Sequence, residues 1–127
     1  MTLNASQRLG LLYSKRYDKK TYHCAHLVVD VLEIELGVDL TGLLLPVLDK
    51  REGVRQILPE WRERFKRIKT PEDKSIIIFR AADKSTHAGV YLRGRVIHLK
   101  EHGGVECVDL SVAALGFQSM RIYKWLG

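Results

Sequence analysis

The sequence predicts a single α+β domain, in which helices come first and a mainly antiparallel sheet follows. The chain has 127 residues, of which 46% are apolar, and this length allows one domain with its own core. Before Pro71 the apolar residues recur at helical spacing. After Pro71 the segments are short, rich in β-branched and aromatic residues, and separated by turn residues. We therefore expect residues 1–127 to form one domain.

Two helices are expected before residue 40. Asn4 or Ser6 can cap a short helix that ends near Leu12. A longer helix is expected from about residue 23 to 36, because Gly37 is a good stop signal. Its apolar residues recur at helical spacing, at Leu27, Val28, Val31, Leu32, Ile34 and Leu36.

The next segment, residues 39–68, is expected to form one or two shorter helices broken by Pro46 and Pro59. The last of them would carry three apolar residues on one face, namely Trp61, Phe65 and Ile68.

Five strands are expected after Pro71, at 75–82, 87–94, 95–102, 104–110 and 118–126. The segment SIIIF at 75–79 is apolar on both faces, so it should be a central strand with the helices on one side of the sheet. A hairpin is expected to turn at Arg93-Gly94. Residues 111–117 should form a short helical turn with Asp109 as its cap.

The chain is basic, with a formal charge of +6, which favours long-range attraction to a polyanion. Its Lys and Arg residues are scattered, however. The segment EWRERFKRIK would suit nucleic acid, but a core-facing apolar stripe with a solvated basic back explains it too, so we expect no nucleic-acid partner. The longest clean apolar run, LLLPVL at 43–48, is far shorter than the about 20 residues that span a bilayer.

One cysteine and two histidines occur along the chain in an order that suits a cysteine nucleophile with a histidine base. Cys24 begins the helix expected at 23–36, where free backbone N–H groups and the helix dipole lower a thiol pKa. His87 and His98 lie on the two arms of the expected hairpin, one diagonal step apart. If the helix tip meets this pair, His87 takes the thiol proton and His98 orients His87. The backbone N–H of Cys24 and a tyrosine hydroxyl would bind the oxyanion, the candidates being Tyr13, Tyr17 and Tyr22.

The stretches YHCAHLVVDVL, SIIIF and, most specifically, HAGVYLRGRVIH resemble the NlpC family of papain-like cysteine peptidases, from about residue 17 to the C-terminus. The resemblance implies that Cys24 is the nucleophile, His87 the base and His98 the third polar residue, with Tyr17 as the oxyanion donor. It also implies a papain-like NlpC-type fold, with N-terminal helices packed on a five-stranded mainly antiparallel sheet, and no cofactor. The chain departs from the family at His23, where the family has Asp, and at Ala25-His26, where it has Ser-Gly.

By the same resemblance, we expect hydrolysis of peptide bonds in bacterial peptidoglycan stem peptides. The N-terminal segment MTLNASQRLG lacks the apolar stretch of a signal peptide, so synthesis in the cytoplasm without Sec export is expected. A phage tail tip, or another delivery route, would bring such an enzyme to the periplasm or the cell wall, in contact with other tail or baseplate proteins. The alternative is a catalytically inactive structural or wall-binding component of a phage-like tail with the same fold.

A zinc site is the remaining alternative for Cys24, with ligands drawn from His23, His26, His102 and Cys107. The Cys-x-His spacing is not one of the usual zinc spacings, so we expect no metal. Cys107, between valines, is expected to be a structural residue, and both thiols are expected to be free of a disulfide. His102, beside a Gly-Gly pair, is expected in a solvated loop.

Overall fold

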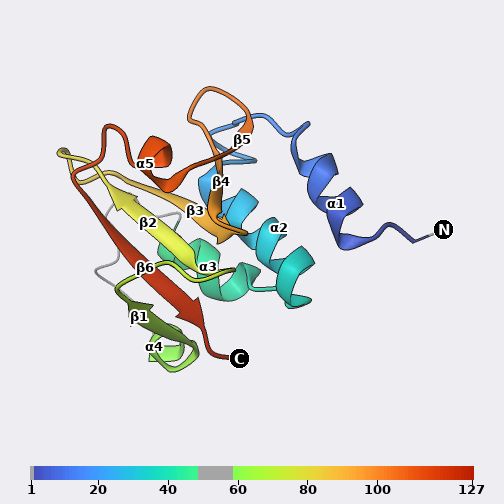
Figure 1. Cartoon of the computed structure of the whole chain (residues 1–127), viewed down its shortest axis with the longest axis horizontal. Coiled ribbons are helices and arrows are strands. Elements are labelled where there is room, and N and C mark those ends of the chain that lie inside the picture. Colours follow the sequence, from blue (N-terminus) through green and yellow to red (C-terminus); the bar gives the residue numbers. More distant parts are fainter. Residues whose placement is uncertain (1, 49–58) are drawn as a thin grey trace.

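The computed structural model describes residues 2–48 and 59–127, and it has the expected α+β architecture (Figure 1). Four helices precede the sheet strands: α1 (Ala5–Leu12), α2 (Cys24–Leu36), α3 (Thr41–Leu48) and α4 (Pro59–Arg64). The strands are β1 (Phe65–Ile68), β2 (Ile76–Arg80), β3 (Thr86–Leu92), β4 (Arg95–Leu99), β5 (Val105–Val108) and β6 (Ser119–Trp125), with α5 (Leu110–Ala113) before the last of them.

The helix boundaries follow from local chemistry. Asn4 caps α1 through a capping box, since its side chain accepts from the N–H of Gln7 and the Gln7 side chain accepts from the N–H of Asn4. Helix α2 ends at Gly37, whose φ of 71° lies in the left-handed region. Pro59 begins α4, as expected for proline, whereas Pro46 lies inside α3. The part of this prediction that concerns residues 49–58 falls outside the described residues.

The sheet has six strands rather than the expected five, in the order β1-β6-β2-β3-β4-β5, and all neighbours are antiparallel. The additional strand is β1, in a segment expected to be helical. Helix α4 stops at Arg64, and the chain then pairs with β6 from Phe65 opposite Trp125. Tertiary pairing therefore overrides a pattern that fitted a helix, and it places Phe65 and Ile68 in different cores.

Strand β2 is central, as its apolar sequence predicts, and residues 76–79 are all buried. Ile76 and Ile78 join the larger core, which α1 to α4 complete on one face of the sheet. Ile77 and Phe79 face a smaller core on the other side, which α5 and the segment after it cover. Both faces of the central strand are thus shielded from water. Among the described residues, no helix has the length and apolar character needed to cross a bilayer.

The left-handed residue at the end of α2 gives a clean stability test. At Gly37 an added Cβ would meet no atom within 4 Å, so a Gly37→Ala loss measures backbone strain alone. We expect Gly37→Ala to lower the free energy of unfolding by about 1–2 kcal/mol. Gly42, in α3, is the matched control, because its Cβ would also meet nothing but its φ is not positive. Gly42→Ala should leave stability unchanged or raise it by up to about 1 kcal/mol. Equal losses in urea unfolding would contradict this account.

Candidate active site

Cys24 is the first residue of α2, and two histidines cap that helix end. The Nδ1 atom of His23 accepts a hydrogen bond from the N–H of Ala25 at 3.4 Å, and the N–H of His23 donates to Nδ1 of His26 at 3.1 Å. His23 and His26 therefore form the capping box that starts α2. Cys24 lies in the first turn of a 13-residue helix, where the helix dipole favours a thiolate.

The hairpin of β3 and β4 brings His87 and His98 together as predicted. Its turn is Arg93-Gly94, and both residues have positive φ, which matches the tight turn preferred between twisted strands. The register sets Gly89 opposite His98, so His87 lies two residues farther along the same face. The Nε2 atom of His87 is 2.8 Å from Nδ1 of His98. The two imidazoles are directly hydrogen-bonded.

Gly89 leaves the space that this contact needs. A Cβ at Gly89 would lie 3.1 Å from Cβ of His98 and 2.8 Å from Cγ1 of Val96. Any side chain there would force β4 to shift at Val96–His98, so glycine is required for close approach of the strands rather than for turn formation.

Glu106 is the site residue that sequence reasoning missed. It lies on β5 directly opposite His98, and its Oε1 atom is 2.8 Å from Nε2 of His98. The other carboxylate oxygen lies 3.9 Å from Nζ of Lys100. A signal was present in the sequence, because a second hairpin turning near Gly103-Gly104 sets residue 98 opposite residue 106.

The histidine pair is largely withdrawn from water. The His87 ring stacks on Phe117, with centroids 5.7 Å apart and planes within 5°, and it also lies near Phe79. Burial, together with the neighbouring His98, lowers the pKa of His87 to about 4. Burial also lowers the pKa of His98, although Glu106 acts in the opposite direction. Both imidazoles are therefore neutral at pH 7, and neutral imidazole is the form that accepts a proton.

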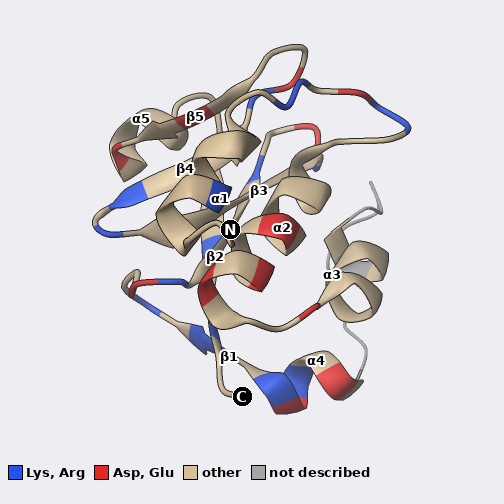
Figure 2. Cartoon of the chain, turned by 90° about the vertical axis from the view of Figure 1, so that its right-hand side faces the viewer, with Lys and Arg blue, Asp and Glu red and all other residues tan. Residues whose placement is uncertain are grey.

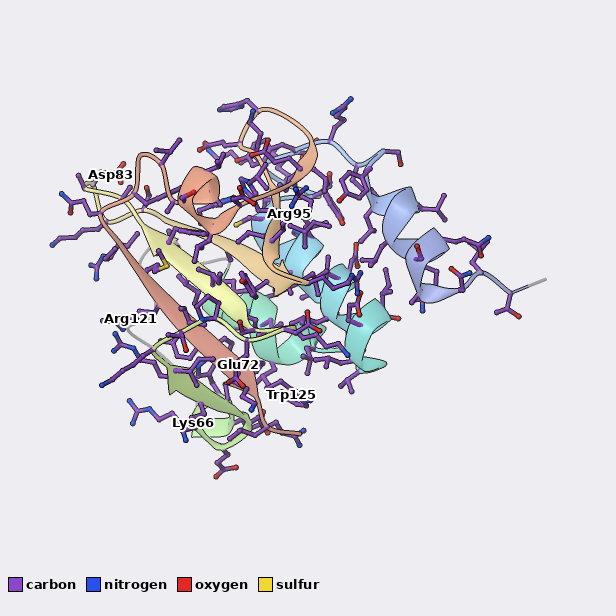
Figure 3. All side chains as sticks on the ribbon, in the orientation of Figure 1. Lys66, Glu72, Asp83, Arg95, Arg121 and Trp125 are labelled. Atoms are coloured by element: carbon purple, nitrogen blue, oxygen red, sulfur yellow. The ribbon has the colours of Figure 1, made fainter. Side chains whose placement is uncertain are left out.

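One cavity of about 980 Å³ unites the predicted site residues. Cys24, His87 and His98 all line it, and so do Glu106 and Tyr17. The turn between β2 and β3, which carries Asp83 (Figure 3), also lines the cavity. Residues from α2, β3, β4 and β5 thus border the same cavity.

Of the three candidate tyrosines, only Tyr17 lines this cavity. Its backbone N–H donates to the carbonyl of Gly103 at 2.9 Å, which ties the segment before α2 to the β4–β5 turn. The Tyr22 hydroxyl donates instead to Asp30 at 2.7 Å, and burial and this carboxylate raise its pKa. The Tyr13 hydroxyl lies beside the thiol of Cys107. Of these three tyrosines, Tyr17 is therefore the one that borders the cavity.

The remaining predicted residues have structural settings. The two cysteines form no disulfide, and Cys107 is half-buried against the larger core. His102 is exposed, as expected for a solvated loop. Asp109 occupies the cap position of α5 but makes no side-chain capping bond, and its carboxylate lies 3.8 Å from Nε of Arg95 instead. In residues 2–48 and 59–127, no three His, Cys, Asp or Glu side chains are grouped to hold a metal ion.

Basic side chains remain dispersed in the folded chain. On the face shown in Figure 2, Lys and Arg are spread over several helices and strands, whereas acidic residues gather on α2. The scattered sequence pattern therefore does not condense into one basic face in this view. A comparison of the sequence with protein-family models and with curated proteins finds no match.

The packing of Phe117 on His87 predicts a measurable titration. We expect NMR titration to give His87 a pKa of about 4, because burial disfavours its charged form. Phe117→Ala admits water, so it should raise this pKa toward the ordinary value of about 6.5. Phe117→Leu keeps an apolar cover and should give a smaller rise. The base would then be protonated, and lost, at a higher pH. An unchanged pKa in Phe117→Ala would contradict the assigned cause.

Proposed function

We propose that the chain is a cysteine peptidase or amidase of the NlpC type, which hydrolyses peptide bonds of bacterial peptidoglycan stem peptides. One observation carries the proposal: a hydrogen-bonded histidine pair shares a cavity with a cysteine at a helix N-terminus. A base with an orienting partner, beside a nucleophile in an electropositive setting, is the arrangement that acyl transfer needs.

The proposed reaction has two stages. Neutral His87 takes the proton from Sγ of Cys24, and the thiolate attacks the carbonyl carbon of the substrate. The N–H of Cys24 and the hydroxyl of Tyr17 bind the oxyanion. His87 then gives its proton to the leaving amine, the C–N bond breaks, and a thioester remains on Cys24. In the second stage His87 takes a proton from water, the hydroxide attacks the thioester, and the released thiolate recovers the proton.

The lining of the cavity supports a peptide that carries both small apolar and charged groups. One wall is apolar, since Val112, Leu115 and Phe117 belong to α5 and the turn after it. Val112 and Leu115 are 47% and 73% exposed, so their side chains are accessible to a ligand in the cavity. Lys19 and Lys100 line the cavity, together with the carboxylates of Asp83, Glu101 and Glu106. Stem peptides offer alanine methyl groups to the first wall and carboxylates to the lysines.

Delivery to the wall belongs to the same proposal. A tail tip of a phage or phage-like particle, with tail or baseplate proteins as partners, would place the enzyme in the periplasm or on the cell wall. The formal charge of +6 supports attraction to anionic wall polymers.

Digestion of purified peptidoglycan tests the proposal. The wild type should release cleaved stem peptides, which mass spectrometry identifies. Cys24→Ala removes the nucleophile, so we expect release to fall to background. Cys107→Ala is the matched control and should retain release, because Cys24 lines the cavity and Cys107 does not. Equal release by the wild type and Cys24→Ala would contradict the assignment of Cys24.

Alkylation separates the enzyme from the inactive tail component with the same fold. Near pH 6 an ordinary thiol is almost wholly protonated and reacts slowly with iodoacetamide. We expect Cys24, observed in Cys107→Ala, to react at least about tenfold faster than Cys107, observed in Cys24→Ala, because the helix dipole favours its thiolate. Equal, slow reaction of both thiols would favour the inactive component.

A further inference from the structure

We propose that Glu106 is a positioning residue that sets the tautomers of both histidines, so that His87 presents a bare Nδ1 as the base. The assignment of the tautomers rests on hydrogen-bond geometry. Its consequence for the rate rests on the proposed function.

The contact between Glu106 and His98 determines which nitrogen of His98 carries the proton. An ionised carboxylate can only accept hydrogen bonds. At 2.8 Å from Oε1 of Glu106, the Nε2 atom of His98 must therefore carry a proton and donate it. The other carboxylate oxygen lies 3.9 Å from Nζ of Lys100.

The tautomer of His98 in turn determines the tautomer of His87. A neutral imidazole carries one N–H, so His98 with its proton on Nε2 has a bare Nδ1 that can only accept. The atom 2.8 Å from that Nδ1 is Nε2 of His87, which must be the donor. His87 then has its only proton on Nε2, and its Nδ1 atom holds the free lone pair.

The pairing of the strands fixes the positions of His87, His98 and Glu106. The β4–β5 register sets Glu106 directly opposite His98, and the β3–β4 register sets Gly89 on its other side. The His98 side chain is 8% exposed, so water has little access to compete for its ring nitrogens. Phe117, parallel to the His87 ring, fixes the plane of that ring.

The hydrogen bonds that link His87, His98 and Glu106 have their largest effect on the rate when His87 becomes charged. As Nδ1 of His87 takes a proton, Nε2–H still donates to His98, and His98 still donates to Glu106. The carboxylate therefore stabilises the transient imidazolium through one intervening ring. Without the carboxylate, His98 is free to carry its proton on Nδ1. In that tautomer Nδ1 of His98 donates the hydrogen bond to Nε2 of His87. The proton of neutral His87 is then on Nδ1, and that nitrogen can no longer accept the proton of Cys24.

The experiment measures tautomers and turnover in the same proteins. Long-range ¹H–¹⁵N NMR of ¹⁵N-histidine protein at pH 7 should show both His87 and His98 protonated on Nε2 in the wild type. In Glu106→Gln the amide can donate or accept, so we expect the Nδ1–H form of His98 to appear. Peptidoglycan digestion by this variant should show kcat lowered by about 10²-fold, with little change in KM. Glu106→Asp, which keeps the charge on a shorter arm, should recover part of the rate.

The control is Glu72→Gln, since Glu72 pairs with Lys124 near the end of β6. Glu72 does not line the cavity, and it lies away from Asp83, which does (Figure 3). It should change neither tautomers nor rate. Protonation of His87 on Nδ1 in the wild type, or Glu106→Gln with unchanged tautomers and kcat, would overturn the proposal. Predicted tautomers that change in Glu106→Gln, in a wild type that cuts no stem peptide, would support the role of Glu106 and contradict the proposed function.

Discussion

The antiparallel register of β3, β4 and β5 is the constraint on which the candidate site depends. Two short turns fix it, and it sets Gly89, His98 and Glu106 in a row across three strands. A shift of one residue in either hairpin would move His98 to the opposite face of the sheet and separate it from His87 and Glu106. The alignment of His87, His98 and Glu106 in the cavity therefore relies on main-chain pairing.

Local signals in the sequence were strong where they described single elements or tight turns. Gly37 ends α2 and Arg93-Gly94 turns the hairpin, as predicted, because both positions need residues that tolerate positive φ. The diagonal contact of His87 with His98 followed from that turn alone. These features depend on neighbours within about a dozen residues, which a sequence pattern can reveal.

Features set by distant segments were not predictable in the same way. Phe65 follows Trp61 at helical spacing, yet it begins a strand because β6, from the other end of the chain, offers it a partner. In the sequence, Glu106 is one polar residue of an expected strand, and only the β4–β5 register shows that it lies opposite His98. Asp109 has the cap position of α5, but Arg95 from another strand lies near its carboxylate. In each case tertiary context decided between local alternatives.

The central claim is that Cys24 forms a thioester while His87 serves as its base. Acid quenching of the protein during digestion of peptidoglycan, followed by mass spectrometry of its own peptides, tests it most directly. A stem-peptide adduct on the peptide that contains Cys24, which hydroxylamine removes, is the result the account predicts. An adduct on Cys107, or cleaved stem peptides with no adduct on either cysteine in any quenched sample, would contradict it.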